Sequence, residues 1–149
     1  MGKLIERKGD LFQSGLPALG HGCNTVGAMG AGIAVKFRRQ WPAMYSAYHS
    51  ACAARQLQAG DVFIWPSGDI TVYNLMTQVY PGADAKLAHI EKAVIAMLLD
   101  AAVRDIGGIG IPRIGCGIGG LEWDDVQDCL QGALDIADPF AGELAVYSL

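Results

Sequence analysis

Two glycine-rich stretches decide the fold of this chain: Asn24-Thr25-Val26-Gly27-Ala28-Met29-Gly30-Ala31-Gly32 and Pro112-Arg113-Ile114-Gly115-Cys116-Gly117-Ile118-Gly119-Gly120. Each follows a short apolar segment typical of a β-strand and leads into a segment with helical spacing. Because glycine has no Cβ, the backbone N–H groups of such loops can approach an anion closely, and a helix N-terminus adds partial positive charge. Two loops of this kind predict a groove that holds a diphosphate from both sides.

Composition is compatible with one folded domain that binds a small anion. The chain has 149 residues, 52% of them hydrophobic, and a formal net charge of −4. A chain of this length buries roughly 70% of its unfolded surface, which is enough for a sheet covered by helices. We therefore expect residues 1–149 to form a single domain. The acidic balance argues against a broad basic face for nucleic acid, but it does not exclude phosphate bound by backbone N–H groups.

The sequence gives no indication of a metal site or a membrane segment. Cys23, Cys52, Cys116 and Cys129 are scattered without a CxxC pair, which favours reduced thiols. The N-terminus lacks the apolar core of a signal peptide, and no apolar run reaches the roughly 18 residues that span a bilayer. We expect a soluble, cytoplasmic protein without a metal or another cofactor.

The rest of the chain alternates between strand and helix patterns. Strands are expected at 4–8, 16–23, 61–65, 70–75, 109–112 and 143–147, and helices at 32–41, 44–54, 87–103 and 123–136. The segment 61–75 has the pattern of a hairpin, with Pro66-Ser67-Gly68-Asp69 at its turn. This order predicts an α/β fold with a mixed sheet between helical layers.

Three features each have two interpretations. The run from Gly115 to Gly120 matches the dinucleotide fingerprint GxGxxG, but the chain ends at Leu149, too soon for the further βαβ unit of a dehydrogenase. Asp10 is either a turn or N-cap residue or a carboxylate that accepts a hydrogen bond from an adenine amine. Asn24 is either a turn residue or a group that binds ribose hydroxyls.

Several blocks together resemble the macro domain family. They are Lys8-Gly9-Asp10-Leu11-Phe12, His21, Met29-Gly30-Ala31-Gly32-Ile33-Ala34-Val35, Thr77, and Pro112-Arg113-Ile114-Gly115-Cys116-Gly117 with Leu121 and Trp123. The chain is most similar to the branch of the terminal ADP-ribose protein glycohydrolase and its chromatin-remodeller-like relatives, from Gly9 to Tyr147. The resemblance implies a three-layer α/β/α macro domain with a central mixed sheet, which binds ADP-ribose at the strand ends.

The resemblance also implies which residues bind ADP-ribose. Asp10, helped by the backbone of Leu11, would recognise adenine, and the two loops would hold the diphosphate and the distal ribose. Tyr147 would either pack on the adenosine or belong to the core. The expected ligand-binding residues are Gly9, Asp10, Leu11, Cys23, Asn24, Met29, Gly30, Ala31, Gly32, Ile33, Thr77, Pro112, Ile114, Gly115, Cys116, Gly117, Ile118, Gly119 and Tyr147.

The chain departs from this branch at two positions that carry its chemistry. The branch has a lysine directly after the threonine matched by Thr77, where this chain has Gln78, and an aspartate where this chain has Gly119. The lysine can form a covalent adduct with the opened ribose, and the aspartate assists proton transfer. Glutamine and glycine do neither. We expect instead a route in which the substrate supplies the base, with Asn24 and Gln78 orienting water or the distal ribose.

Other side chains are weaker candidates. Asp84 and Lys86 would substitute for the aspartate and lysine that this chain lacks, or they cap the helix at 87–103 and face solvent. Cys116 is either an activated thiol or a small buried filler. Lys36, together with Arg38 and Arg39, forms a basic cluster, which is either a solvated face or a surface that attracts acidic surroundings.

The predicted function is removal of mono-ADP-ribose from glutamate or aspartate side chains, with deacetylation of O-acetyl-ADP-ribose as a related activity. The alternative is a non-catalytic reader of ADP-ribose. The expected partners are ADP-ribose and ADP-ribosylated proteins, with nucleic acid only as an ADP-ribosylated substrate and no membrane. We expect a monomer.

Overall fold

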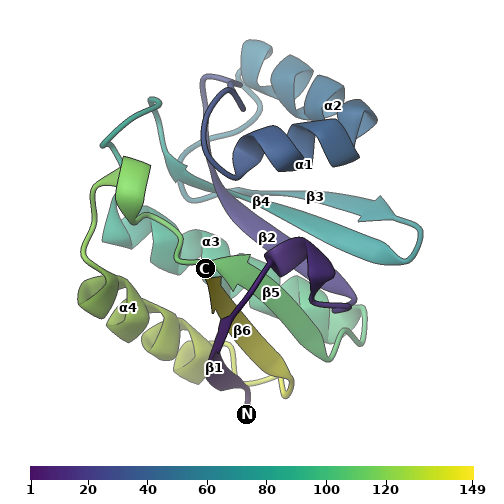
Figure 1. Cartoon of the computed structure of the whole chain (residues 1–149), viewed down its shortest axis with the longest axis vertical. Helices are drawn as coiled ribbons and strands as arrows, with labels where there is room; N and C mark the ends of the chain where they lie inside the picture. The colour runs from purple at the N-terminus through teal and green to yellow at the C-terminus, as the bar shows by residue number, and fades with distance from the viewer.

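A computed structural model, which describes all 149 residues, places one six-stranded sheet between two layers of helices (Figure 1). The strands are β1 (Lys3–Lys8), β2 (Ala18–Asn24), β3 (Val62–Ser67), β4 (Ile70–Gln78), β5 (Gly108–Pro112) and β6 (Glu143–Ser148). The helices are α1 (Ala34–Gln40), α2 (Pro42–Ala53), α3 (Leu87–Val103) and α4 (Trp123–Ile136), with the 3₁₀ turns η1 (Leu11–Gln13) and η2 (Gly117–Gly119). The predicted three-layer α/β/α class is confirmed.

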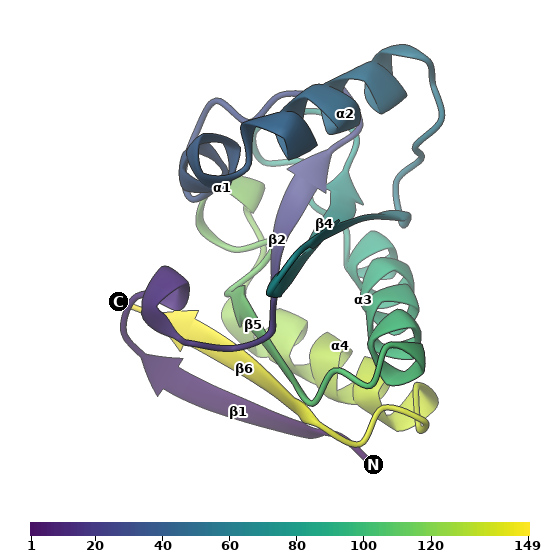
Figure 2. The same ribbon diagram turned by 90° about the vertical axis from the view of Figure 1, so that its right-hand side faces the viewer.

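The sheet is mixed and brings the two glycine-rich loops to one edge. Its strand order is β1-β6-β5-β2-β4-β3, and every neighbouring pair is parallel except the hairpin of β3 and β4. The chain leaves β2 toward α1 on one face of the sheet and leaves β5 toward α4 on the other (Figures 1 and 2). Neighbouring parallel strands whose connections diverge open a crevice at their carboxyl ends, where ligands bind in α/β folds.

Each face of the sheet has its own apolar core. Under α3 and α4, the buried side chains include Ile90, Met97 and Leu98, which recur at the helical spacing expected from the sequence. Under α1 and α2, the core includes Phe37 and Met44. These two cores fix the helices against the sheet and so fix the loops that precede α1 and α4.

The strand and helix boundaries differ from the sequence expectation in places that matter for the site. β2 begins at Ala18, two residues later than expected, because Pro17 has no N–H for the ladder. Pro42 opens α2 at its first turn, where a proline is tolerated. β4 runs on to Gln78, three residues beyond the expected end, since its pairing with β2 continues. This extension carries Thr77 and Gln78 to the edge where the loops lie.

None of the helices is both long and apolar enough to cross a membrane. The structure contains no group of three or more His, Cys, Asp or Glu side chains placed to hold a metal ion.

Candidate functional site

The carboxyl edge of the sheet contains one continuous groove. A cavity of about 410 Å³ lies between the two glycine-rich loops, and a second of about 320 Å³ lies beside Asp10 and Tyr147. Gly32, Ile33 and Pro112 line both cavities, so the two are adjacent, and together they are called the groove below. In Figure 2, η2 lies beneath α1, at the ends of β2 and β5. The groove is therefore bounded by the loop before α1 and by the loop that contains η2.

Asn24, the last residue of β2, shapes the first loop. Its Oδ1 accepts hydrogen bonds from the backbone N–H groups of Gly27 (3.0 Å) and Ala28 (3.1 Å), and its Nδ2 donates to the carbonyl of Ala28 (2.9 Å). The Tyr48 hydroxyl donates to the carbonyl of Asn24. The turn interpretation of Asn24 is therefore correct, and one Nδ2 N–H is left over for a ligand.

The middle of the first loop keeps its backbone donors available. The N–H groups of Met29, Gly30, Ala31, Gly32 and Ile33 donate no hydrogen bond within the protein. A backbone N–H is an obligatory donor that water or a ligand has to satisfy. Consecutive free donors at the wall of a groove form a concave anion-binding surface of the kind expected from the sequence.

The second loop has the same property and depends on glycine for its shape. Gly115, Gly117 and Gly120 have positive φ angles of 76°, 62° and 86°, which side-chain-bearing residues rarely adopt. A Cβ on Gly115 would lie 2.7 Å from Cδ1 of Ile90, so only glycine fits there. The N–H groups of Gly115, Gly117 and Ile118 donate no hydrogen bond within the protein.

The two loops meet across the groove. A Cβ on Gly32 would lie 3.2 Å from Cδ1 of Ile118, and Ile118 is an exposed large apolar side chain at 56% of its full area. Ile118 thus reaches from the second loop to the first over the groove. A linear ligand in this position would have one loop on each side.

The smaller cavity contains the groups expected for adenine recognition. Asp10 caps η1, where its Oδ1 accepts from the N–H of Phe12 at 3.0 Å. The capping interpretation is thus correct, and Oδ2 remains exposed for a ligand donor. Tyr147 is half-buried against the α1–α2 core, as the core interpretation expects, and it also lines this cavity, while its packing on adenosine stays a prediction.

Gln78 and Gly119 face each other at the other end of the groove. Gln78 Nε2 donates to the carbonyls of Tyr80 (2.6 Å) and Gly82 (2.9 Å), which uses both of its N–H groups. Its Oε1 lies 3.6 Å from the position of a Cβ on Gly119. The two departures from the related branch are therefore neighbours in space, and what Gln78 presents to the groove is a hydrogen-bond acceptor.

Asp84 acts on the loop that follows β4. Its Oδ2 accepts from the N–H groups of Val79 (3.1 Å) and Tyr80 (3.0 Å), and these bonds help to hold the pKa of this carboxyl below its usual value. Neither Asp84 nor Lys86 lines the groove. The surface interpretation is correct for Lys86, which is exposed, but the capping interpretation is wrong, because no side chain caps the start of α3 and Asp84 bonds instead to the loop after β4.

A buried polar cluster supports the floor of the groove. His21 Nε2 lies 2.7 Å from Asn74 Oδ1, and its ring stacks on Phe37 with 3.8 Å between the centroids. Burial lowers the pKa of His21 to about 4, although the hydrogen bond to Asn74 partly opposes this shift. The Thr77 hydroxyl donates to the carbonyl of Cys23 and ties the end of β4 to β2. His21 is therefore a neutral structural residue under the groove.

The cysteines beside the groove are poor nucleophiles. Burial raises the pKa of Cys116, although the charge of Arg113 partly opposes this, and burial raises the pKa of Cys23 still more clearly. Both thiols line the groove and stay protonated at neutral pH. The filler interpretation of Cys116 is therefore favoured over the activated thiol.

The structure brings nearly all of the expected ligand-binding residues to this groove. Gly117, at the start of η2, is the exception, since it lines neither cavity. Which of them contact a ligand stays a prediction. The lining residues that the sequence did not indicate are Phe12, Gly22, Ala28, Ala34, Lys36, Pro81, Gly82, Arg113 and Leu149. Pro81 and Gly82 reach the groove because Gln78 holds their loop, a contact without a sequence signal.

Comparisons with known proteins agree with this geometry. The model of the Macro domain family matches residues 21–130. The chain is 34% identical over 129 residues to a DNA ADP-ribosyl glycohydrolase of Mycobacterium tuberculosis, which covers 84% of this chain and 37% of that protein. It is 26% identical to human ADP-ribose glycohydrolase OARD1, over 95% of this chain and 89% of that one. An ADP-ribose 1''-phosphate phosphatase of Candida albicans is 33% identical, with 83% and 89% covered.

Among solved structures, the macrodomain of Thermus aquaticus DarG superposes with a TM-score of 0.87 at 29% identity, and each chain is covered completely. The macrodomain of Mycobacterium tuberculosis DarG gives the same TM-score at 30% identity. The chain spans little more than a third of the mycobacterial glycohydrolase, at 37% of its length.

Proposed function

The chain belongs to the macro domain family, and we propose that it hydrolyses the bond between the distal ribose of ADP-ribose and an acceptor group. One observation carries this proposal: two facing loops whose backbone N–H groups are free, from Met29 to Ile33 and at Gly115, Gly117 and Ile118. Donors on both sides of a narrow groove suit the two phosphates of one ligand. Several relatives are named as hydrolases of ADP-ribosyl bonds, which supports the same chemistry here.

The groove suggests how ADP-ribose would lie in it. Adenine occupies the smaller cavity, with its amine toward Oδ2 of Asp10 and its ring near Tyr147. The diphosphate passes between the two loops. The distal ribose then reaches the end where Gln78 and Gly119 face each other, and the acceptor leaves the groove there.

The residues at that end support a water route. Water attacks the anomeric carbon of the distal ribose, the bond to the acceptor oxygen breaks, and the acceptor leaves with the bonding electron pair. The proton of the water passes to a phosphate oxygen of the substrate. Gln78 Oε1 accepts a hydrogen bond from the water or a ribose hydroxyl and so orients the reacting groups.

We favour a carboxylate as the acceptor, that is, a glutamate or aspartate ester. A carboxylate has a pKa of roughly 4 and leaves without first taking up a proton. This suits a groove in which Gly119 stands where the related branch places an acid. O-acetyl-ADP-ribose is also an ester of the distal ribose, but there water attacks the acetyl carbonyl carbon, the bond to the ribose oxygen breaks, and that oxygen takes up the proton of the water. One relative is named as a DNA ADP-ribosyl glycohydrolase and another as an ADP-ribose 1''-phosphate phosphatase. ADP-ribosylated DNA and ADP-ribose 1''-phosphate are therefore two further substrates to compare.

The test is release of ADP-ribose from matched substrates at one enzyme concentration. The substrates are a glutamate-ADP-ribosylated peptide, ADP-ribosylated single-stranded DNA, ADP-ribose 1''-phosphate and O-acetyl-ADP-ribose. We expect the ester-linked substrates to be cleaved fastest. Faster cleavage of the DNA-linked substrate would overturn the assignment of a carboxylate acceptor, but it would still support the proposal that the protein is a hydrolase.

A reader without turnover is the second candidate, because Gln78 and Gly119 replace both groups of the covalent route. Calorimetry with ADP-ribose separates the cases when it is combined with the release assay. Binding with no release from any of the four substrates, at stoichiometric protein, would identify a reader. Absence of binding would overturn the site itself.

A further inference from the structure

The charges of this chain are segregated along the sequence. Between Asp10 and Asp61 there is no aspartate or glutamate, although the chain has 15 of them. The cations of this stretch are Lys36, Arg38, Arg39 and Arg55. After Arg113, by contrast, the chain has acids but no lysine or arginine. Helix α1 thus carries only positive charge, α2 has no charged side chain and is followed by Arg55, and α4 carries only negative charge.

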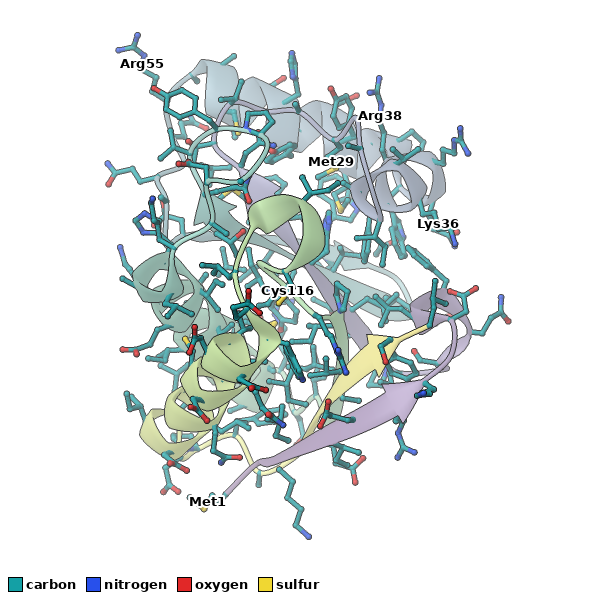
Figure 3. The ribbon with its side chains drawn as sticks, turned by 60° about the vertical axis from the view of Figure 1, so that its left-hand side comes forward. Met1, Met29, Lys36, Arg38, Arg55 and Cys116 are labelled. Carbon is teal, nitrogen blue, oxygen red and sulfur yellow. The ribbon has the colours of Figure 1, made fainter.

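The cations of α1 and Arg55, which follows α2, form no ion pair within the protein. The ion pairs of the structure are Lys92–Asp61, Arg104–Asp100 and Arg113–Glu6, and none involves this layer. All four cations are exposed. Figure 3 shows Lys36, Arg38 and Arg55 along the outer side of the α1–α2 layer. An unpaired cationic layer in a protein of net charge −4 favours an anionic partner.

A separate cavity of about 630 Å³ lies in this layer, on the outer side of the first loop. Its polar lining consists of Arg38, Arg39, Tyr45 and Ser46. The guanidinium of the exposed Arg38 lies over the half-buried Tyr45 ring, 4.1 Å from its centroid. Met29 and Gly30 line both this cavity and the groove, so the two sites share one loop as their wall.

We propose that this cavity, lined by Arg38 and Arg39, binds a phosphodiester group of a single-stranded nucleic acid. Guanidinium groups match phosphate oxygens with paired N–H donors, and a serine hydroxyl adds a third donor. The exposed guanidinium of Arg38, which lies over the Tyr45 ring, offers a flat surface for an adjacent base, which an acidic peptide has no group to use. The inference does not depend on which acceptor the groove cleaves, because the strand binds in a cavity outside the groove whether or not it carries ADP-ribose.

Binding of an unmodified, fluorescein-labelled 12-residue oligothymidylate, measured by anisotropy at low salt, tests this assignment. We expect the Arg38→Ala/Arg39→Ala variant to bind at least about tenfold more weakly than the unchanged protein. Its slope of log K against log salt is expected to fall by about 1.4, since each phosphate contact on a single strand contributes roughly 0.7. The matched control is Lys3→Ala/Arg7→Ala, which removes the same charge from β1 and is expected to bind almost normally.

Each other outcome counts against the proposal. It is overturned if the unchanged protein does not bind the oligonucleotide, or if both variants lose affinity equally. It is also overturned if polyglutamate competes as well as the oligonucleotide at equal charge, because the surface would then bind acidic peptides. Calorimetry with ADP-ribose on the same variants distinguishes the two proposals. The inference predicts that ADP-ribose affinity of the Arg38→Ala/Arg39→Ala variant changes little. If the unchanged protein does not bind ADP-ribose, only the proposed function is overturned.

Discussion

Asn24, the last residue of β2, holds the first glycine-rich loop in shape through three side-chain hydrogen bonds. We predict that Asn24→Ala lowers the free energy of unfolding by about 2 kcal/mol, because buried backbone groups of the loop lose their partners. ADP-ribose affinity falls with it, since the free N–H groups are no longer held in place. Chemical denaturation and calorimetry measure both effects. A loss of turnover with unchanged stability and affinity would instead show a purely chemical role.

Gln78 has both a structural and a positioning role. Its amide N–H groups hold the loop after β4, while its Oε1 faces the groove. We predict that Gln78→Ala reduces kcat by about tenfold or more, within the range for groups that position reactants. Gln127→Ala is the matched control, since the Gln127 side chain bonds to Glu6 and does not line the groove. Steady-state kinetics on the preferred substrate measure the effect. Full turnover by the Gln78 variant would remove this residue from the mechanism.

His21 makes folding stability depend on pH in a defined direction. Its pKa is about 4 in the folded protein, against 6.5 for an ordinary histidine. The unfolded chain therefore takes up a proton below pH 6.5 that the folded protein takes up only near pH 4. We predict that this residue removes on the order of 3 kcal/mol of stability as the pH falls from 6.5 to 4. Denaturation across this range is expected to show a shallower decline for His21→Gln.

At the scale of elements, the two glycine loops work as a pair because β2 and β5 are parallel neighbours. A substitution at Gly30 can test whether the first loop contacts the ligand. The φ angle of Gly30 is not positive, and a Cβ there would meet nothing within 4 Å. We predict that Gly30→Ala leaves stability almost unchanged but weakens ADP-ribose binding, because the methyl group occupies the space of the ligand.

Gly132, in α4, is the matched control for this substitution. A Cβ there also meets nothing within 4 Å, and alanine favours a helix by roughly 1 kcal/mol over glycine. Gly132→Ala is therefore expected to raise the melting temperature and leave ADP-ribose affinity unchanged. If both alanine variants bind ADP-ribose normally, the first loop does not contact the ligand.

The elements themselves were largely predictable, since their signals are local. The apolar spacing around Ile90 and Leu98 gave α3 its correct bounds, and the turn at residues 66–69 gave the hairpin. The end of β4 was not predictable from its own residues. Gln78 belongs to a strand because β2 lies beside it, and that partner is more than fifty positions away in the chain.

At the scale of the whole molecule, the sheet has one apolar core on each face. Side chains that stabilise the core under α3 and α4 can therefore lie away from the groove. Leu98 is fully buried in the core under α3 and α4 and does not line the groove. We predict that Leu98→Ala costs about 2–5 kcal/mol of unfolding free energy through the cavity it leaves. ADP-ribose affinity well below the melting temperature is expected to stay the same. A parallel loss of affinity would mean that the two faces are coupled.

The whole-molecule charge also has to be considered by location. The net charge of −4 argues against a nucleic-acid surface when it is taken as one number. The fold places α1 and α2, which belong to the acid-free stretch from residue 11 to 60, on one side of the sheet with the cations exposed, and the acidic α4 on the other side. A charge sum cannot contain this information, because it depends on which face of the sheet each helix covers.

The α/β class, the order of strands and helices, and the two glycine-rich loops could be inferred from the sequence. So could the turn at Asn24, whose side chain bonds to Gly27 and Ala28. These features depend on apolar spacing, backbone freedom and hydrogen bonds that act over a few residues. The contact of Gln78 with Gly119, and the meeting of the two loops at one groove, required the tertiary structure. Both join residues distant in the chain, and the parallel pairing of β2 with β4 and β5 brings those residues together.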